Sequence, residues 1–151
     1  MLHLLIIQAK FSSNLYTEPP TILFHGTTSN RASKIVGNQF YETQGFKKAP
    51  VFLAEDYNTA RYFAFEKLAA LVPNQPKSLT VVEFKIPTQL ANDLGIGQDS
   101  RSVIGVFEEL RFPDIPGGTG HERILRNLTD VQRFNDVLKA GQIKVRRQRV
   151  K

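Results

Sequence analysis

Short apolar runs recur along the chain, separated by polar or proline-containing breaks. Residues 78–86, SLTVVEFKI, alternate between two sets of side chains with a period of two, which predicts a β-strand. The continuous apolar runs at 21–24 and 51–54 predict two short buried strands. Further strands are expected at 103–112, 123–126 and 143–150, and residues 2–11 are expected to form a strand or a packed arm.

Three other segments place their apolar residues at helical spacing. The first begins near residues 29–30, where Ser or Asn can cap a helix, and it stops at Gly37. The second is expected to start from Asp56 and the third from Asp130. The apolar stripe expected on the second helix consists of Tyr57, Ala60, Ala64, Leu68 and Leu71.

The order of these elements defines the expected fold class. Strands and helices alternate at first, and the later part is mainly strands with one late helix, which predicts α+β with a mostly antiparallel core. At 151 residues the chain suits a single domain spanning 1–151, with residues 1–20 as an N-terminal arm or extra strand. Loops are expected at 39–50, 88–102 and 113–120.

Composition restricts the chemistry. The chain has no cysteine, which excludes disulfides and thiolate metal sites, and its three histidines lie far apart, so no metal is expected. No stretch approaches the roughly 20 apolar residues of a membrane span. We therefore expect no membrane association and a cytoplasmic protein, or one delivered into a host or target cell.

Charge leaves two interpretations open. The net charge is +6, and residues 143–151, IKVRRQRVK, contain no acid. Such a segment fits a surface that attracts phosphates, and it equally fits a strand edge protected from aggregation by its charges.

The familiar nucleotide and hydrolase motifs are absent. The sequence has no GxxxxGK[ST] phosphate loop, no GxGxxG fingerprint after a strand and no GxSxG nucleophile elbow. Three places remain: His25 at the expected end of a strand, Phe52 on a short strand with Tyr62 on the helix after it, and Glu122 at the start of a late strand. Gly26 next to His25 permits close approach of a backbone or a ligand.

These places resemble the motifs of one superfamily. ILFHGTTSNRASKI, APVFLAEDYNTARYFA and GHERILRN are similar to three motifs of the ADP-ribosyltransferases. The branch concerned has a His–Tyr–Glu triad and includes the poly(ADP-ribose) polymerases and diphtheria-type toxins. Its motifs are a strand ending in His-Gly-Thr or His-Gly-Ser, a Tyr-containing strand with an aromatic about eleven residues on, and a glutamate opening a late strand. The resemblance covers residues 21–126.

The resemblance implies NAD as the substrate, held by the first two motifs in a split, mostly antiparallel β core with flanking helices. His25 would hydrogen-bond a ribose hydroxyl, and the Gly26 backbone would hold the nicotinamide carboxamide. Thr27 belongs to the same motif. Phe52 and Tyr62 would stack on the nicotinamide ring.

It also implies the reaction, a mono-ADP-ribosyl transfer to a macromolecule in which His25 and Glu122 are catalytic. Glu122 would bond the ribose 2′-hydroxyl and stabilise the positive charge that develops as nicotinamide leaves. The positive net charge suggests DNA or RNA as the acceptor. Relatives of this size include toxins, effectors and phage proteins, and the oligomeric state stays open.

The sequence departs from the pattern at one triad position, because Phe52 stands where the branch has tyrosine. Glu108 and Glu109 are rival acids, since VFEELRF is also strand-like. Three alternatives follow: a non-catalytic module binding NAD, ADP-ribose or nucleic acid, an RNA 2′-phosphotransferase-like enzyme, or a rifampin-type antibiotic-modifying transferase.

Overall fold

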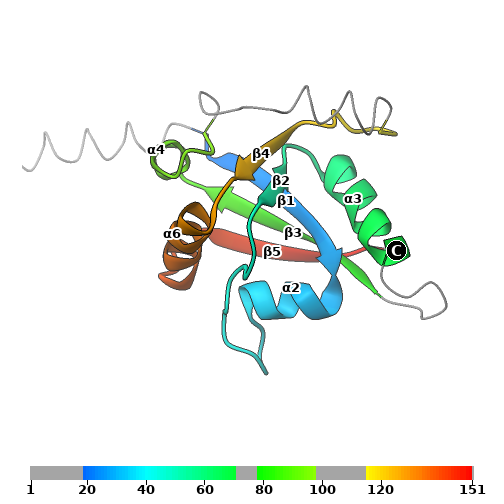
Figure 1. Cartoon of the computed structure of the whole chain (residues 1–151), viewed down its shortest axis with the longest axis horizontal. Coiled ribbons are helices and arrows are strands. Elements are labelled where there is room, and N and C mark those ends of the chain that lie inside the picture. The colour runs from blue at the N-terminus through cyan, green and yellow to red at the C-terminus, as the bar shows by residue number, and fades with distance from the viewer. Residues whose placement is uncertain (1–18, 71–77, 98–114, 151) are drawn as a thin grey trace, which may run out of the picture.

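The computed structural model describes residues 19–70, 78–97 and 115–150. Their strands form a five-stranded antiparallel sheet with the order β4-β2-β1-β3-β5 (Figure 1). The strands are β1 (Thr21–Thr28), β2 (Val51–Ala54), β3 (Leu79–Ile86), β4 (Glu122–Leu125) and β5 (Lys144–Arg149). The helices are α2 (Ser29–Val36), α3 (Tyr57–Ala70), α4 (Thr88–Asp93) and α6 (Leu128–Lys139).

The sheet carries apolar contacts on both faces. The larger cluster joins Leu23, Val82 and Phe84 of the sheet to side chains of α2 and α6. The smaller cluster joins Ala54 and Val81 to α3 on the other face. Burial of both faces explains why β3 shows a continuous row of buried residues at 79–82 despite its alternating sequence.

The central strand pairs unequally with its two neighbours. β1 and β3 are in register over eight residues, from Thr21↔Ile86 to Thr28↔Leu79. β1 and β2 share a single bridge, Phe24↔Ala54. Beyond that bridge the two strands separate, and the sheet opens between β1–β3–β5 and β2–β4.

The structure confirms the α+β class and most of the expected elements. The strand expected at 21–24 is longer, because pairing with β3 carries it through His25 to Thr28. His25 therefore lies within a strand and not at the start of a loop. Helix α4 was expected as loop. The segments expected as strands at 2–11 and 103–112, and the rival acids at 108–109, lie outside the described residues.

Two helix starts differ from expectation by one to three residues. Thr28 caps α2, with its hydroxyl accepting from the Arg31 amide, and Asn127 caps α6. Asp56 caps α3 as expected, through the Thr59 amide. Within the described ranges, no helix combines the length and the apolar character that crossing a bilayer requires.

Candidate functional site

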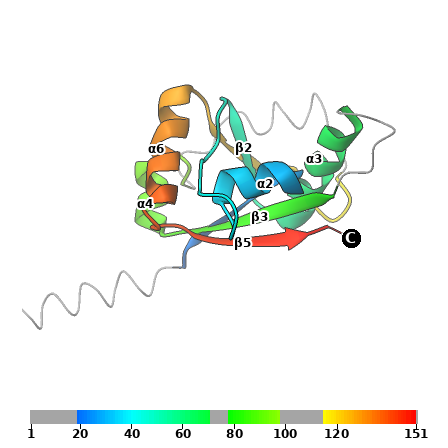
Figure 2. The same cartoon turned by 90° about the horizontal axis from the view of Figure 1, so that it is seen from below.

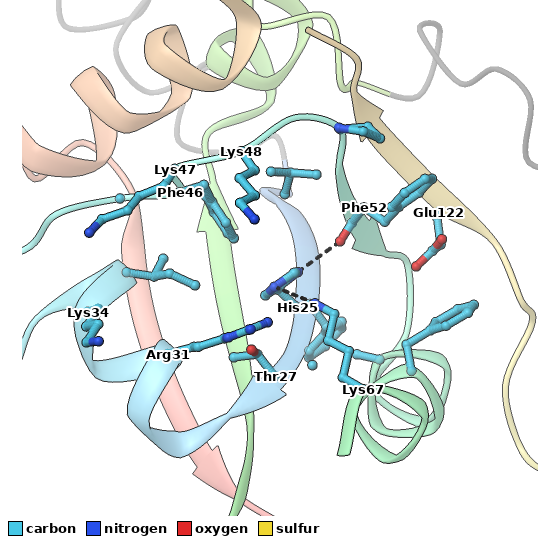
Figure 3. Close-up of a pocket in the computed structure, with 18 residues that line it drawn as sticks. His25, Thr27, Arg31, Lys34, Phe46, Lys47, Lys48, Phe52, Lys67 and Glu122 are labelled. Atoms are coloured by element: carbon cyan, nitrogen blue, oxygen red, sulfur yellow. Dashed lines mark hydrogen bonds between the residues drawn. The ribbon is translucent and has the colours of Figure 1, made fainter. Parts of the chain in front are cut away.

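A cavity of about 590 Å³ lies at the opening between β1 and β2. Its size falls within the roughly 300–1,000 Å³ of small-molecule sites. Five of the residues singled out in the sequence line it: His25, Gly26, Thr27, Phe52 and Glu122. Figure 3 shows His25 at the centre, with the cations Lys34 and Lys47 to one side and Phe52 and Glu122 to the other.

His25 is held in one tautomer by a bond across the opening. Its Nδ1 lies 3.0 Å from the carbonyl oxygen of Phe52 (Figure 3), and a carbonyl only accepts, so Nδ1 donates. Nε2 is then an acceptor, and the Lys67 ammonium lies 3.4 Å from it. Burial lowers the pKa of His25 from 6.5 to about 3, with Lys67 and Arg31 contributing in the same direction. The imidazole is therefore neutral, and its acceptor nitrogen faces Lys67 in the cavity.

Glu122 is positioned by β4 and by the turn before it. β4 pairs with β2, which sets Glu122 opposite Ala54. The turn is tied to the start of α3, because Asp56 accepts from the Thr119 amide, and Thr59 accepts from the Gly120 amide at 3.0 Å. The cap of one helix thus fixes the entry to the strand that begins with the acid.

The Glu122 carboxyl is buried and has an unsatisfied oxygen. The residue is 4% exposed, and its Oε2 has no hydrogen-bond partner within the described part of the chain. Burial raises the pKa of Glu122 from 4.5 to about 8, although the nearby positive charge of Lys67 opposes this. The carboxyl is therefore mostly protonated at neutral pH. Additional positive charge in the cavity would favour its ionised form.

Thr27 offers a second unsatisfied group. The residue is 1% exposed, and its Oγ1 has no hydrogen-bond partner among the described residues. Buried polar atoms are almost always satisfied in native proteins. Two such atoms in the lining of one cavity fit a polar ligand that would complete their hydrogen bonds.

Lys67 is a charged group that acts on both catalytic candidates. It lies on α3, contacts His25 Nε2 and interacts electrostatically with Glu122. Burial and the charge of Arg31 lower the pKa of Lys67, whereas Glu122 raises it. This lysine was not predicted as a site residue from the sequence, although it follows Phe63 by four residues and so shares its face of the helix.

The rest of the positive charge gathers on one side of the cavity. Arg31 and Lys34 come from α2, and Lys47 and Lys48 come from the segment before β2. All four are exposed, so their charges are hydrated and can approach a ligand. No acid lies in α2. This side of the cavity is suited to phosphate groups.

The other side of the cavity is aromatic. Phe52 and Phe63 line it, whereas Tyr62, expected to stack on a ligand, does not. The ring of Tyr62 instead stands edge-on to Phe63, with centroids 5.8 Å apart. The aromatic residue expected about eleven positions after Phe52 is therefore Phe63, which follows Phe52 by eleven residues. One residue along a helix turns a side chain by about 100°, which is enough to leave the site.

Phe46 closes the cavity beside the histidine. Its ring stands edge-on to His25 with centroids 4.9 Å apart, and it also contacts Phe84 and Phe134. Asn135 of α6 holds its backbone by accepting from the Phe46 amide at 2.8 Å and donating to its carbonyl at 2.7 Å. The part of the expected loop 39–50 around Phe46 is thus held in place and forms a wall of the cavity.

The packing of α3 against β1 explains the glycine at position 26 without any ligand. A methyl group built on Gly26 would overlap the backbone carbonyl of Ala60 in α3. The absent side chain lets α3 approach β1 closely, and this approach brings Phe63 and Lys67 to the cavity.

No protein-family model matches this chain, and neither a curated protein nor a solved structure is significantly similar to it.

Proposed function

We propose that the protein is an NAD-dependent mono-ADP-ribosyltransferase that cleaves the bond between nicotinamide and ribose. The observation that carries the proposal is the pairing in one cavity of a buried carboxyl, Glu122, with a neutral imidazole acceptor, His25. The two residues are 97 positions apart in the sequence, and the resemblance to the ADP-ribosyltransferases implies that both contact NAD.

The chemical character of the cavity fits the parts of NAD. The exposed cations around Arg31 would bind the pyrophosphate, and Phe52 and Phe63 would flank the nicotinamide ring. His25 Nε2 would accept a hydrogen bond from a ribose hydroxyl, once Lys67 moves aside. The opening of the sheet between β1 and β2 also agrees with the split core of the ADP-ribosyltransferase fold.

Glu122 would act by electrostatics. Cleavage of the nicotinamide–ribose bond leaves positive charge on the sugar, and a fixed carboxylate beside it stabilises the transition state more than the ground state. The nicotinamide ring of NAD is itself cationic, so its entry favours the ionised form of Glu122. The ionised carboxylate can then accept the proton of the attacking acceptor group.

The test is release of nicotinamide from NAD by the Glu122→Gln variant. Glutamine keeps the shape of the protonated carboxyl but cannot ionise, so the fold should survive and the rate should fall at least about 100-fold. Glu66→Gln is the matched control, because Glu66 is exposed on α3 and does not line the cavity. Wild-type turnover by Glu122→Gln would remove Glu122 from the mechanism.

A second candidate, a binding module without turnover, is favoured by one observation. Phe52 lacks the hydroxyl of the triad tyrosine, although its backbone still bonds His25. Calorimetry with NAD alongside the nicotinamide assay separates the two candidates. Binding of NAD without nicotinamide release supports the module, and release supports the transferase.

A further inference from the structure

The positive charge of the cavity continues onto the surface of the sheet. Arg147 of β5 reaches α2, where its Nη1 lies 3.3 Å from the Ser33 hydroxyl. Ser33 lies between Arg31 and Lys34, which line the cavity. Figure 2 shows α2 lying over β3 and β5. The cations of α2 and of β5 therefore form one connected surface that begins at the cavity.

The register of β5 divides its arginines between the two faces of the sheet. Arg147 and Arg149 pair with Val82 and Thr80, on the face that α2 covers. Arg146 points to the other face, because side chains alternate along a strand, and it lies opposite Glu83. The cations on the α2 face thus have no acid across the strand, whereas Arg146 has one.

We define the basic face as Arg31, Lys34, Arg147 and Arg149. Neither α2 nor β5 contains an acid, and every residue of β5 is exposed. Arg147 and Arg149 are two residues apart, about 7 Å along the strand. Such a row of cations can follow the successive phosphates of an extended chain.

Exposed aromatic rings lie at the end of α2. Phe40 is 77% exposed and Tyr41 is 47% exposed. The amides of both residues donate to the side chain of Asn38, at 2.7 and 2.9 Å, which fixes the turn that presents them. In Figure 1 the segment after α2 projects away from the sheet. Lys139 lies beside the two rings, together with one acid, Glu42.

We propose that the basic face and the rings of Phe40 and Tyr41 bind single-stranded nucleic acid, with its phosphates along α2 and β5 and bases stacked on the rings. Cations combined with exposed aromatic rings are the common means of binding single strands. A membrane surface fits less well, because its phosphates lie in a plane and cannot follow cations into a cavity. The role of this face as a docking surface for the acceptor rests on the proposed transferase activity. Its role as a binding surface for single-stranded nucleic acid does not.

The experiment measures binding of labelled 20-nucleotide single strands of DNA and RNA by fluorescence anisotropy at several NaCl concentrations. The double variant Arg147→Gln/Arg149→Gln should bind more weakly, and its log–log salt slope should fall by about 1.4, since each phosphate contact on a single strand contributes about 0.7. Arg146→Gln, on the opposite face of the same strand, is the matched control and should keep the wild-type slope.

The contribution of the aromatic rings to binding can be measured separately from that of the cations. Phe40→Ala should weaken binding about tenfold without changing the salt slope, because stacking involves no counterion release. Release of nicotinamide from free NAD should be unchanged in the Arg147→Gln/Arg149→Gln variant. Failure of this binding proposal can therefore be distinguished from failure of the proposed reaction.

Three results would overturn the proposal. The first is no measurable binding of either strand by the wild-type protein at low salt. The second is an equal loss of binding in Arg146→Gln and in the double variant, which would indicate diffuse charge rather than a face. The third is binding to phosphatidylserine vesicles without binding to the oligonucleotides.

Discussion

Lys67 occupies the position beside His25 that the proposed mechanism assigns to a ribose hydroxyl of NAD. Its ammonium is 3.4 Å from His25 Nε2, the acceptor that the proposed mechanism reserves for a ribose hydroxyl. It also interacts with Glu122 and opposes the effect of burial on the pKa of that carboxyl. In the proposed mechanism, this one side chain would therefore compete with NAD for His25 and would also favour ionisation of Glu122. This double effect makes Lys67 a sensitive position for testing the mechanism.

The proposed reaction should depend on pH through Glu122. Burial raises the pKa of Glu122 to about 8, and the carboxyl must lose its proton to stabilise positive charge. We expect kcat/KM for nicotinamide release to rise with pH and to level off above about 8, since this ratio reports the free enzyme. Lys67→Met should move the midpoint to higher pH, because it removes the positive charge that holds the pKa down.

Lys34→Met is the control for this shift. Lys34 also lines the cavity, but it is exposed and does not contribute to the pKa of Glu122. Its loss should raise KM for NAD without moving the midpoint. An identical pH profile for the wild type and Lys67→Met would mean that the group observed in the kinetics is not Glu122.

At the scale of elements, α6 supports the site without lining it. Its Asn135 pairs with both backbone groups of Phe46, and Phe46 packs against His25. The segment between α2 and β2 has no regular structure at these residues, so this amide replaces the pairing that a strand would provide.

Asn135→Ala should loosen this wall. A buried amide and a buried carbonyl of Phe46 would lose their partner, at a cost of about 1–3 kcal/mol or more in the free energy of unfolding. KM for NAD should rise as well, because the ring beside His25 is no longer fixed. Denaturant titration and nicotinamide-release kinetics measure the two effects.

Asn127→Ala provides a matched comparison on the same helix. Asn127 caps α6 through the Asp130 amide, and loss of such a cap costs about 1 kcal/mol. This variant should be less stable but should keep the wild-type KM. If it raised KM as much as Asn135→Ala, general destabilisation and not the Phe46 wall would explain the effect.

The elements that were predictable from sequence are those with strong local patterns. The alternation of 78–86 identified β3, and the apolar run at 51–54 gave β2 with its bounds. The continuation of β1 past His25 was not predictable, because Gly26 and two threonines resemble a turn and only pairing with β3 keeps them extended. Helix α4, TQLAND, is too short and polar to show a period.

The site was predictable to the extent that its residues belong to recognisable motifs. His25, Phe52 and Glu122 were singled out from separate segments, and all three line the cavity. Lys67 and the cations of α2 were not identified, because lysine and arginine are common on helix surfaces and only tertiary packing decides which of them face a cavity. Phe63 was missed in favour of its neighbour, Tyr62.

At the scale of the whole molecule, the two buried groups act on stability with opposite signs. The pKa of His25 is lowered to about 3, so between pH 3 and 6.5 the unfolded chain holds a proton that the folded chain lacks, and stability rises with pH. The pKa of Glu122 is raised to about 8, so between pH 4.5 and 8 the folded chain holds the extra proton, and stability falls with pH.

Glu122→Gln isolates the second effect. The difference in unfolding free energy between this variant and the wild type should be constant below pH 4.5 and should shift in favour of the variant up to pH 8. The slope is at most about 1.4 kcal/mol per pH unit. Urea titrations at pH 5, 6.5 and 8 measure the difference, with Glu66→Gln as the control. A difference that does not change with pH would show that burial does not protonate Glu122.

The packing of Gly26 against Ala60 limits what tolerance to substitution can reveal about this site. In a mutational scan under selection for activity, Gly26 would tolerate no other residue even if it never met a ligand, because any side chain would force α3 away from β1. A scan that found only glycine at position 26 would therefore report on backbone packing and not on ligand binding. The neighbouring Thr27 is the more informative position, since Thr27→Val exchanges its unsatisfied hydroxyl for a methyl group and removes no hydrogen bond found within the described part of the fold. Selection against Thr27→Val would therefore point to a ligand that bonds this hydroxyl.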